Sequence, residues 1–347
     1  MDIREIIQRP EYQFIDTNEH LSGRIMFLTM GGSYAYGTNN AGSDIDIRGC
    51  VMPRESDLIG LSRFEQYVDD DTDTTIYALN RLILLLSRGN PNCIELLGCR
   101  PDQYAMVTEG GRMLLNNRKL FLSKEGAKSF IGYANELLYR LQHVMARDRM
   151  DTKAQEQHIM ASCERAMQRF HERYTKLPEG AITLHIGPSP KKNTDEEILM
   201  DVSLSDYPLR DYASLWKDMQ TLAKNFSTLN HRNRKKDDAH VCKHMMHLVR
   251  LYYELLDVLK KGDIVTYREA EHDLLMDIRN GKFMDSNGLV RSEFYDLLEG
   301  LKREADYALD NTSLPETPNL NEINDLSVAL LRSAIGKESL CAKYLPL

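Results

Sequence analysis

Long apolar segments are absent from this sequence of 347 residues. No apolar run approaches the roughly 20 residues that a membrane-spanning helix needs. The first ten residues, MDIREIIQRP, carry charges throughout and lack the apolar centre of a signal peptide. These absences predict a cytoplasmic protein that has no membrane partner.

Closely spaced cysteine pairs and internal repeats are also missing. None of the six cysteines forms a CxxC pair, and several lie in apolar segments such as NPNCIELLGC. This pattern favours reduced, mostly buried thiols over disulfides or a zinc site. The net charge of −8 argues against a strongly basic nucleic-acid coat protein, although it leaves room for a local basic patch. The absence of repeats excludes solenoid folds.

The chain is long enough for two domains, because a single hydrophobic core usually stops growing below this length. Two segments near the N-terminus, RIMFLTM (24–30) and DIDIRGCVM (44–52), are apolar or alternate with period two, which is typical of strands. From about residue 120 the pattern becomes helical. The predicted fold class is therefore α+β, with a small mixed β-sheet domain over 1–120 and a mainly α-helical domain over 121–347.

Further elements follow from the same patterns. Short strands are predicted at 64–68 and 74–77, and a polar loop is predicted over 185–199. Apolar residues at helical spacing predict helices at 79–88, 123–150, 152–177, 212–229, 238–262, 267–281 and 292–310.

Two aspartates one residue apart, Asp44 and Asp46, are the main chemical signal. In an extended strand, side chains two residues apart point to the same face, so these two carboxylates lie side by side while Ile45 and Ile47 face the core. Like charges this close repel unless a cation lies between them. Mg²⁺ prefers such carboxylate oxygens together with phosphate oxygens. A solvent-facing strand edge is the other interpretation of the pair.

A glycine-rich turn, Gly32-Ser33, directly follows the first apolar strand and precedes the two aspartates. Glycine lets the backbone approach a phosphate closely, and successive N–H groups in a tight turn form an anion-binding nest. The Ser33 hydroxyl could donate to the outermost phosphate. A simple turn explains GGS equally well by itself, but the turn and the aspartate pair together indicate a metal-bound nucleoside triphosphate.

Gly32-Ser33 followed by Ser43-Asp44-Ile45-Asp46 resembles the pattern of the DNA polymerase beta nucleotidyltransferase superfamily. Within that superfamily, the chain is similar to predicted nucleotidyltransferases found beside RNA ligases, largely in bacteria and phages. The resemblance extends over about residues 25–320 and includes the blocks SYAYGTNNAGSDIDIRG, DTTIYALNRLILLLSRGNPNCIELL, FLSKEGAKSFIGYANELLYRL, KHMMHLVRLYYELL, IRNG and SLPETPN.

The resemblance implies a small mixed sheet whose adjacent strands carry three carboxylates. These carboxylates bind two Mg²⁺ or Mn²⁺ ions, and an acceptor hydroxyl attacks the α-phosphate of an NTP while pyrophosphate leaves. Asp44 and Asp46 supply the first two carboxylates. The third is predicted to be Asp73, at the head of DTTIY; the other acidic candidates are Asp71, then Asp69 and Asp70, and Glu95, for which helix capping or structural hydrogen bonding is an equal explanation.

A basic stripe on the predicted helix 238–262 carries Lys243, His247 and Arg250, together with His240. Their spacing places them on one helical face. A solvated surface is one explanation. The resembled family has a comparable block, so we expect Lys243, His247 and Arg250 to contact the triphosphate or a nucleic-acid backbone. A basic loop just upstream could also bind nucleic-acid phosphates or be a soluble loop; it contains Arg232, Arg234, Lys235 and Lys236.

The predicted function is metal-dependent transfer of an NMP from an NTP to an acceptor hydroxyl, for which an RNA or tRNA end is the candidate. One alternative is a non-catalytic nucleotide or RNA sensor with the same fold. Another is a transferase that modifies a protein or a small molecule, as toxins and resistance enzymes do.

Overall fold

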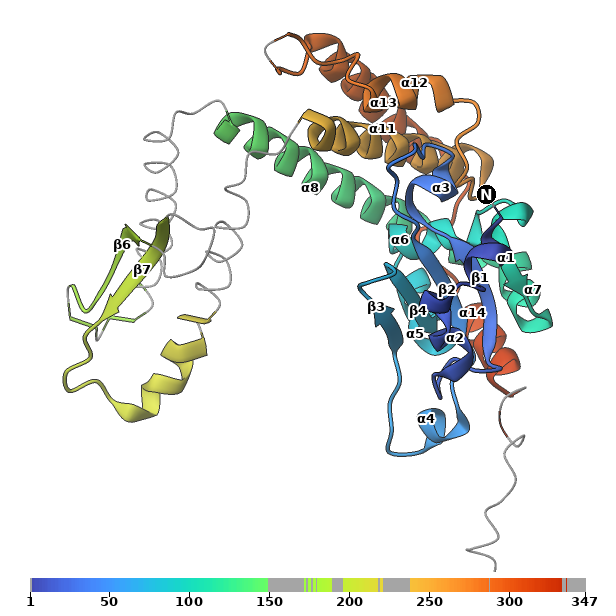
Figure 1. Cartoon of the computed structure of the whole chain (residues 1–347), viewed down its shortest axis with the longest axis horizontal. Coiled ribbons are helices and arrows are strands. Elements are labelled where there is room, and N and C mark those ends of the chain that lie inside the picture. The colour runs from blue at the N-terminus through green and yellow to red at the C-terminus, as the bar shows by residue number, and fades with distance from the viewer. Residues whose placement is uncertain are drawn as a thin grey trace, which may run out of the picture. The chain divides into compact units, whose positions relative to one another are not determined.

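The computed structural model describes residues 2–148, 172, 174–175, 177–178, 180–188, 196–217, 219–220, 238–286, 288–332 and 335. The chain forms two compact units (Figure 1). The first contains Met1–Leu141 and Asp238–Leu347, and the second contains Gln142–Asp237. The functional domains expected over 1–120 and 121–347 stay a prediction.

A five-stranded mixed sheet forms the centre of the first unit, as the α+β prediction requires. Its strand order is β3-β4-β2-β1-β5. Only β2 and β4 run parallel to each other, whereas the other neighbours are antiparallel. The strands are β1 (Ile25–Met30), β2 (Ile47–Val51), β3 (Gln66–Asp69), β4 (Thr74–Ala78) and β5 (Tyr104–Val107).

Strand β1 is buried along its whole length, which explains why its sequence is an unbroken apolar run rather than an alternating one. One core cluster joins β1, β2 and β4 to the N-terminal segments α1 (Ile3–Ile6), η1 (Pro10–Tyr12) and α2 (Phe14–Thr17). Helix α5 (Leu79–Ser87) packs on β2 and β4 through its leucines.

Helices make up most of the remaining described part of the first unit, in agreement with the predicted helical second half. Helix α11 (Asp238–Lys261) packs against α12 (His272–Arg279) and α13 (Ser292–Asn311), as Figure 1 shows. The other helical segments are α3 (Gly32–Tyr36), α4 (Glu55–Ile59), α6 (Pro91–Ile94), η2 (Glu95–Leu97), η3 (Pro101–Gln103), α7 (Glu109–Asn116), η4 (Arg118–Phe121), α8 (Lys124–Asp148) and α14 (Leu320–Arg332). Helix α14 has no counterpart among the predicted helices.

Three predicted elements differ from the structure. The helix expected over 267–281 is shorter and forms α12 (His272–Arg279). The strand expected over 44–52 begins only at Ile47. Ile47 pairs with Met30, which is the last residue of β1, and after Met30 the chain turns into α3. The polar loop expected over 185–199 is largely an antiparallel hairpin of β6 (Ile182–Pro188) and β7 (Glu196–Val202). Both hairpin strands contain alternating apolar residues, a signal that the proline and lysine residues between them obscured.

Several predicted elements lie outside the described residues. They include nearly all of the helix expected over 152–177 and most of the second half of the helix expected over 212–229. Within the described part of the chain, no helix combines the length and the apolar character that crossing a membrane requires.

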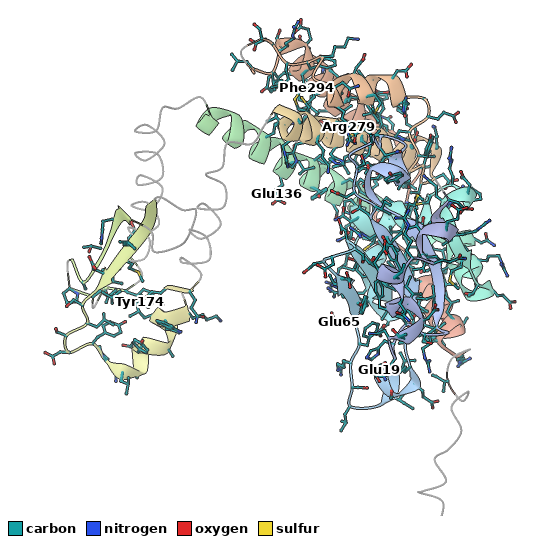
Figure 2. The ribbon with its side chains drawn as sticks, viewed as in Figure 1. Glu19, Glu65, Glu136, Tyr174, Arg279 and Phe294 are labelled. Atoms are coloured by element: carbon teal, nitrogen blue, oxygen red, sulfur yellow. The ribbon has the colours of Figure 1, made fainter. Side chains whose placement is uncertain are left out.

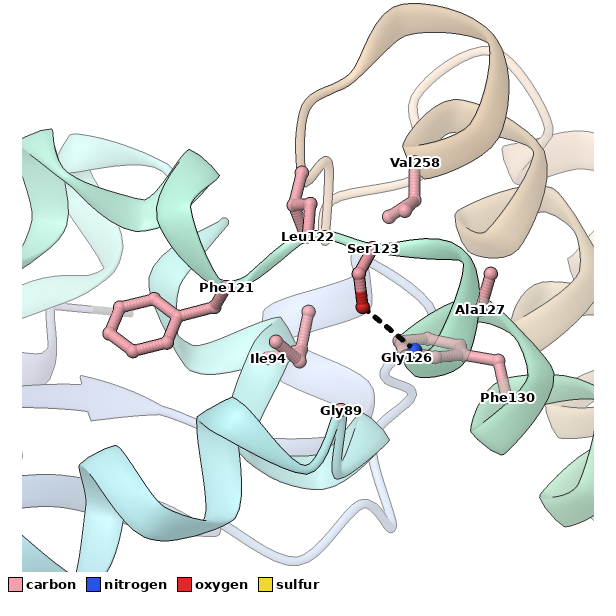
Figure 3. Close-up of a pocket in the computed structure, with 9 residues that line it drawn as sticks. All are labelled: Gly89, Ile94, Phe121, Leu122, Ser123, Gly126, Ala127, Phe130 and Val258. Carbon is pink, nitrogen blue, oxygen red and sulfur yellow. Dashed lines mark hydrogen bonds between the residues drawn. The ribbon is translucent and has the colours of Figure 1, made fainter. Parts of the chain in front are cut away.

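A small pocket lies where the end of α5 meets the start of α8 (Figure 3). The two backbones approach so closely that a Cβ on Gly89 would lie 2.3 Å from the Cα of Gly126. Ser123 caps α8, since its Oγ accepts a hydrogen bond of 3.1 Å from the Gly126 N–H. The other lining residues are apolar, so this pocket is a packing gap between helices.

Candidate functional site

Asp46 and Asp73 form a facing pair of carboxyl groups. Asp46 directly precedes the first residue of β2, and Asp73 directly precedes the first residue of β4. Burial, and then a hydrogen bond that Asp46 donates to Asp73, raise the pKa of Asp46 to about 7. The same hydrogen bond, more than any other contact, holds the pKa of Asp73 below its usual value. Two carboxyl groups in direct contact repel each other when both are ionised, unless a positive charge lies beside them.

The parallel register of β2 and β4 explains why these two aspartates meet. Ile47 of β2 pairs with Thr74 of β4, so the residues that precede them lie side by side. Asp73 has a left-handed backbone, with φ of 44°, and its carbonyl accepts a hydrogen bond of 3.3 Å from the Ile47 N–H. The structure thus brings Asp73, the preferred third carboxylate, next to Asp46.

Asp44 lies in the segment before β2 and is exposed. Among the residues that the structure describes, no group of three or more His, Cys, Asp or Glu side chains is arranged to hold a metal ion. Mg²⁺ does not require such a group, because in nucleotide sites it commonly takes one or two protein carboxylates, with phosphate and water as the other ligands. The facing pair of Asp46 and Asp73 fits that need, and the participation of Asp44 stays a prediction.

Gly32 lets the carboxylate of Asp46 lie directly against the backbone at the start of α3. Its φ of 54° is left-handed, and a Cβ at this position would lie 1.8 Å from Oδ2 of Asp46. The N–H of Gly31 donates a hydrogen bond of 2.9 Å to the Asp46 carbonyl, so the turn and the acidic segment are joined through the backbone as well. Ser33 follows as a buried residue of α3. The predicted glycine-serine turn and the predicted acidic residue are therefore in contact.

Substitution of Gly32 by alanine is expected to lower the free energy of unfolding by about 2 kcal/mol, because alanine is strained at this φ and its Cβ displaces Asp46. Urea unfolding measures the change. Gly132→Ala is the matched control, since Gly132 is an exposed residue of α8 with no atom within 4 Å of an added Cβ. This control is expected to raise the free energy of unfolding by roughly 0.5–1 kcal/mol. Equal changes in the two variants would contradict the close contact between Gly32 and Asp46.

Arg48 contacts both Asp46 and Asp73, which we call the acidic pair. Arg48 was not among the predicted site residues. Its Nη2 lies 3.4 Å from Oδ1 of Asp46 and 3.0 Å from Oδ1 of Asp73. Its Nη1 donates to the carbonyl groups of Ile47 and Asp73. The signal in the sequence is its position two residues after Asp46, which places both side chains on the same side of the chain.

The predicted basic stripe of α11 is divided between two environments. Lys243 is exposed, and its positive charge lowers the pKa of both Asp46 and Asp73, so it lies near the acidic pair. His247 packs edge-on against the Tyr36 ring at 5.9 Å between centroids, and burial holds its pKa well below the usual value.

Arg250 is 3% exposed and is surrounded by protein groups. Its Nη1 lies 3.2 Å from Oε2 of Glu95 and 2.7 Å from Oε2 of Glu254. Its guanidinium stacks on the Tyr36 ring at 3.6 Å, and the Tyr36 hydroxyl donates a hydrogen bond of 2.9 Å to Glu95. We call Tyr36, Glu95, Arg250 and Glu254 the buried network. It fixes the end of α3 against α11, whereas nucleotide contacts of Arg250 and His247 stay predictions.

Arg279 of α12 holds the loop between α3 and Asp44. Its Nη1 donates a hydrogen bond of 2.6 Å to the Thr38 carbonyl, and its Nη2 donates one of 3.1 Å to Oγ of Ser43. Figure 2 labels Arg279 among the helical elements of this unit. In the sequence, Arg279 belongs to the IRNG block, but that block did not predict which residues Arg279 contacts. The basic loop with Arg232, Arg234, Lys235 and Lys236 lies outside the described residues.

Comparison with family models matches the part of the chain that contains the sheet and the acidic pair. Residues 3–160 match the RNA repair pathway DNA polymerase beta family (RlaP). No curated protein and no solved structure matched the chain.

Proposed function

We propose that the chain transfers an NMP from an NTP to the hydroxyl of an RNA or tRNA end. Residues 3–160 match the model of the RNA repair pathway DNA polymerase beta family, and a domain of that family is usually a nucleotidyltransferase. The observation that supports this proposal most is the facing pair of Asp46 and Asp73, in contact with the Gly32 turn. Carboxylates beside an anion-binding turn are suited to a metal-bound triphosphate.

The family implies divalent metal ions. Asp46 and Asp73 would hold Mg²⁺ or Mn²⁺, with Asp44 as the third ligand and a second ion as a further part of the proposal. When bound, the metal neutralises the charge that develops during phosphoryl transfer.

The chain itself supplies position and charge rather than a covalent nucleophile. The N–H groups of the Gly32-Ser33 turn and the Ser33 hydroxyl would hold the outer phosphates, and Lys243, which lies near both aspartates, would contact the same phosphates. The buried network and Arg279 keep the turn and the following loop in place. The acceptor hydroxyl is then oriented toward the α-phosphate, and pyrophosphate leaves.

An incubation with each labelled NTP, total cellular RNA and either Mg²⁺ or EDTA tests the proposal. We expect label in RNA with Mg²⁺ and none with EDTA, because the carboxylate pair needs the cation to bind a polyphosphate. Label in the protein fraction or in a small molecule would assign a different acceptor to the same reaction. Nucleotide binding without transfer from any NTP would contradict the proposal and favour a sensor.

A further inference from the structure

The guanidinium of Arg48 occupies the place where a cation would neutralise the acidic pair. One nitrogen, Nη2, contacts a carboxylate oxygen of Asp46 at 3.4 Å and one of Asp73 at 3.0 Å. Arg48 lowers the pKa of both carboxyl groups, as does Lys243. Lys243 is exposed and extends from α11, whereas Arg48 is anchored at the pair by two carbonyl groups.

A divalent ion that binds both aspartates competes with this guanidinium for the same two carboxylates. A cation that binds Asp46 and Asp73 together takes Oδ atoms at about 2.0–2.1 Å for Mg²⁺, and it repels a positive group a few ångströms away. The two arrangements therefore exclude each other at Oδ1 of each aspartate, so an ion that takes both Oδ1 atoms displaces Arg48.

The side chain of Arg48 runs along the turn that precedes α3. Its Cγ lies 2.8 Å and its Nε 3.7 Å from the position that a Cβ would take on Gly31. A guanidinium released from the carboxylates is thus next to the Gly31–Ser33 backbone. Arginine binds phosphate oxygens through a planar fork of N–H donors, so a triphosphate at this turn offers it a new partner.

We propose that Arg48 competes with the divalent cation for Asp46 and Asp73 and releases them when its guanidinium moves to the phosphates of a bound triphosphate. This inference rests on the proposed function, because it assumes that the acidic pair is the metal site. It assigns Arg48 a positioning role: the metal-free pair is neutralised by arginine, and the nucleotide opens the site to the ion that it carries.

Binding of Mn²⁺ alone, measured by electron paramagnetic resonance on the full chain, tests the competition. Arg48→Gln is expected to bind Mn²⁺ on the order of tenfold more tightly than the wild type, since a competing charge in direct contact is removed. Arg112→Gln is the matched control, because Arg112 is an exposed residue of α7 that donates to the Val107 carbonyl. It loses the same charge and is expected to bind Mn²⁺ as the wild type does.

Binding of tripolyphosphate in EDTA tests the second half of the proposal. Arg48→Gln is expected to bind this probe several-fold more weakly than the wild type, because one phosphate partner is lost. Tighter Mn²⁺ binding together with weaker tripolyphosphate binding is a pattern that a purely structural role of Arg48 does not produce. Arg48→Lys retains the charge but loses the fork, and we expect its Mn²⁺ affinity to lie between those of the other two proteins. If Arg48→Gln does not fold, Arg48→Lys is the variant that tests the competition.

The outcomes separate this inference from the proposed function. Asp46→Asn is expected to lose Mn²⁺ binding. If it does, and Arg48→Gln and Arg48→Lys bind Mn²⁺ no better than the wild type, the metal site stands and the competition is overturned. If Asp46→Asn and both Arg48 variants bind Mn²⁺ as the wild type does, the acidic pair is not the metal site and both proposals fail. Unchanged tripolyphosphate binding in Arg48→Gln would overturn the movement of Arg48 to the phosphates.

Discussion

Replacement of Asp46 by asparagine is expected to lower the rate of nucleotidyl transfer by about three orders of magnitude. Asparagine has nearly the same shape, but it removes the charge that would bind the metal, and metal charge stabilisation contributes about 4 kcal/mol to such a reaction. The measurement is the rate of label transfer from the NTP at saturating Mg²⁺. Asp73→Asn is also expected to lower the rate of nucleotidyl transfer, because Asp73 faces Asp46.

Asp71→Asn is the control for this experiment. Asp71 is exposed in the same turn and was the first alternative to Asp73 as the third carboxylate. We expect Asp71→Asn to retain transfer close to the wild-type rate. Wild-type transfer by Asp46→Asn would remove the basis of the proposed function, and a loss in Asp71→Asn without one in Asp73→Asn would move the third carboxylate to Asp71.

Replacement of Arg250 by methionine is expected to lower the free energy of unfolding by about 3–5 kcal/mol, because it leaves buried carboxylates without their cation. Glu95 and Glu254 are both buried, and burial already raises the pKa of each, that of Glu254 to about 8. Urea unfolding gives the change. Adding Glu95→Gln and Glu254→Gln to Arg250→Met is expected to restore part of the lost stability, since the uncompensated charges are then absent.

Arg100→Met is a matched control for Arg250→Met. Arg100 also stacks on a tyrosine, with its guanidinium 3.8 Å from the centre of the Tyr267 ring, and its salt bridge to Asp102 is exposed. Exposed ion pairs contribute about 0–1 kcal/mol, so we expect a change within that range. Similar changes for the two variants would show that burial of the Arg250 charge is not what stabilises the fold.

The sequence contained enough information for four of the five strands and for the position of Asp73 beside one of them, whereas β5 was not predicted. β1 is predicted by its apolar run, and Asp73 is predicted by its place at the head of the next strand. Those predictions depend only on local patterns and strand order. The exact start of β2 depended on where its partner β1 ends, which a pattern within one segment does not contain.

Arg48 and Arg250 show why the rest of the site was harder to predict from the sequence. The position of Arg48 depends on the parallel pairing of β2 and β4, which brings two distant turns together. Arg250 lies on a helical stripe that would be exposed on an isolated amphipathic helix. Apolar side chains are buried on several sides of α11, including Val241, Met246 and Val249. Arg250 therefore faces the interior although Lys243 on the same stripe is exposed, and only the three-dimensional structure supplies Tyr36 and Glu95 as partners of Arg250.

The buried network also limits how far the family segment can be used as an independent module. Residues 3–160 carry Tyr36 and Glu95, but Arg250 and Glu254 come from α11, beyond the end of that segment. A recombinant fragment cut after residue 160 would lose the arginine that pairs with Glu95 and would leave the end of α3 unsupported. Domain transplantation and minimal expression fragments should therefore carry α11 along.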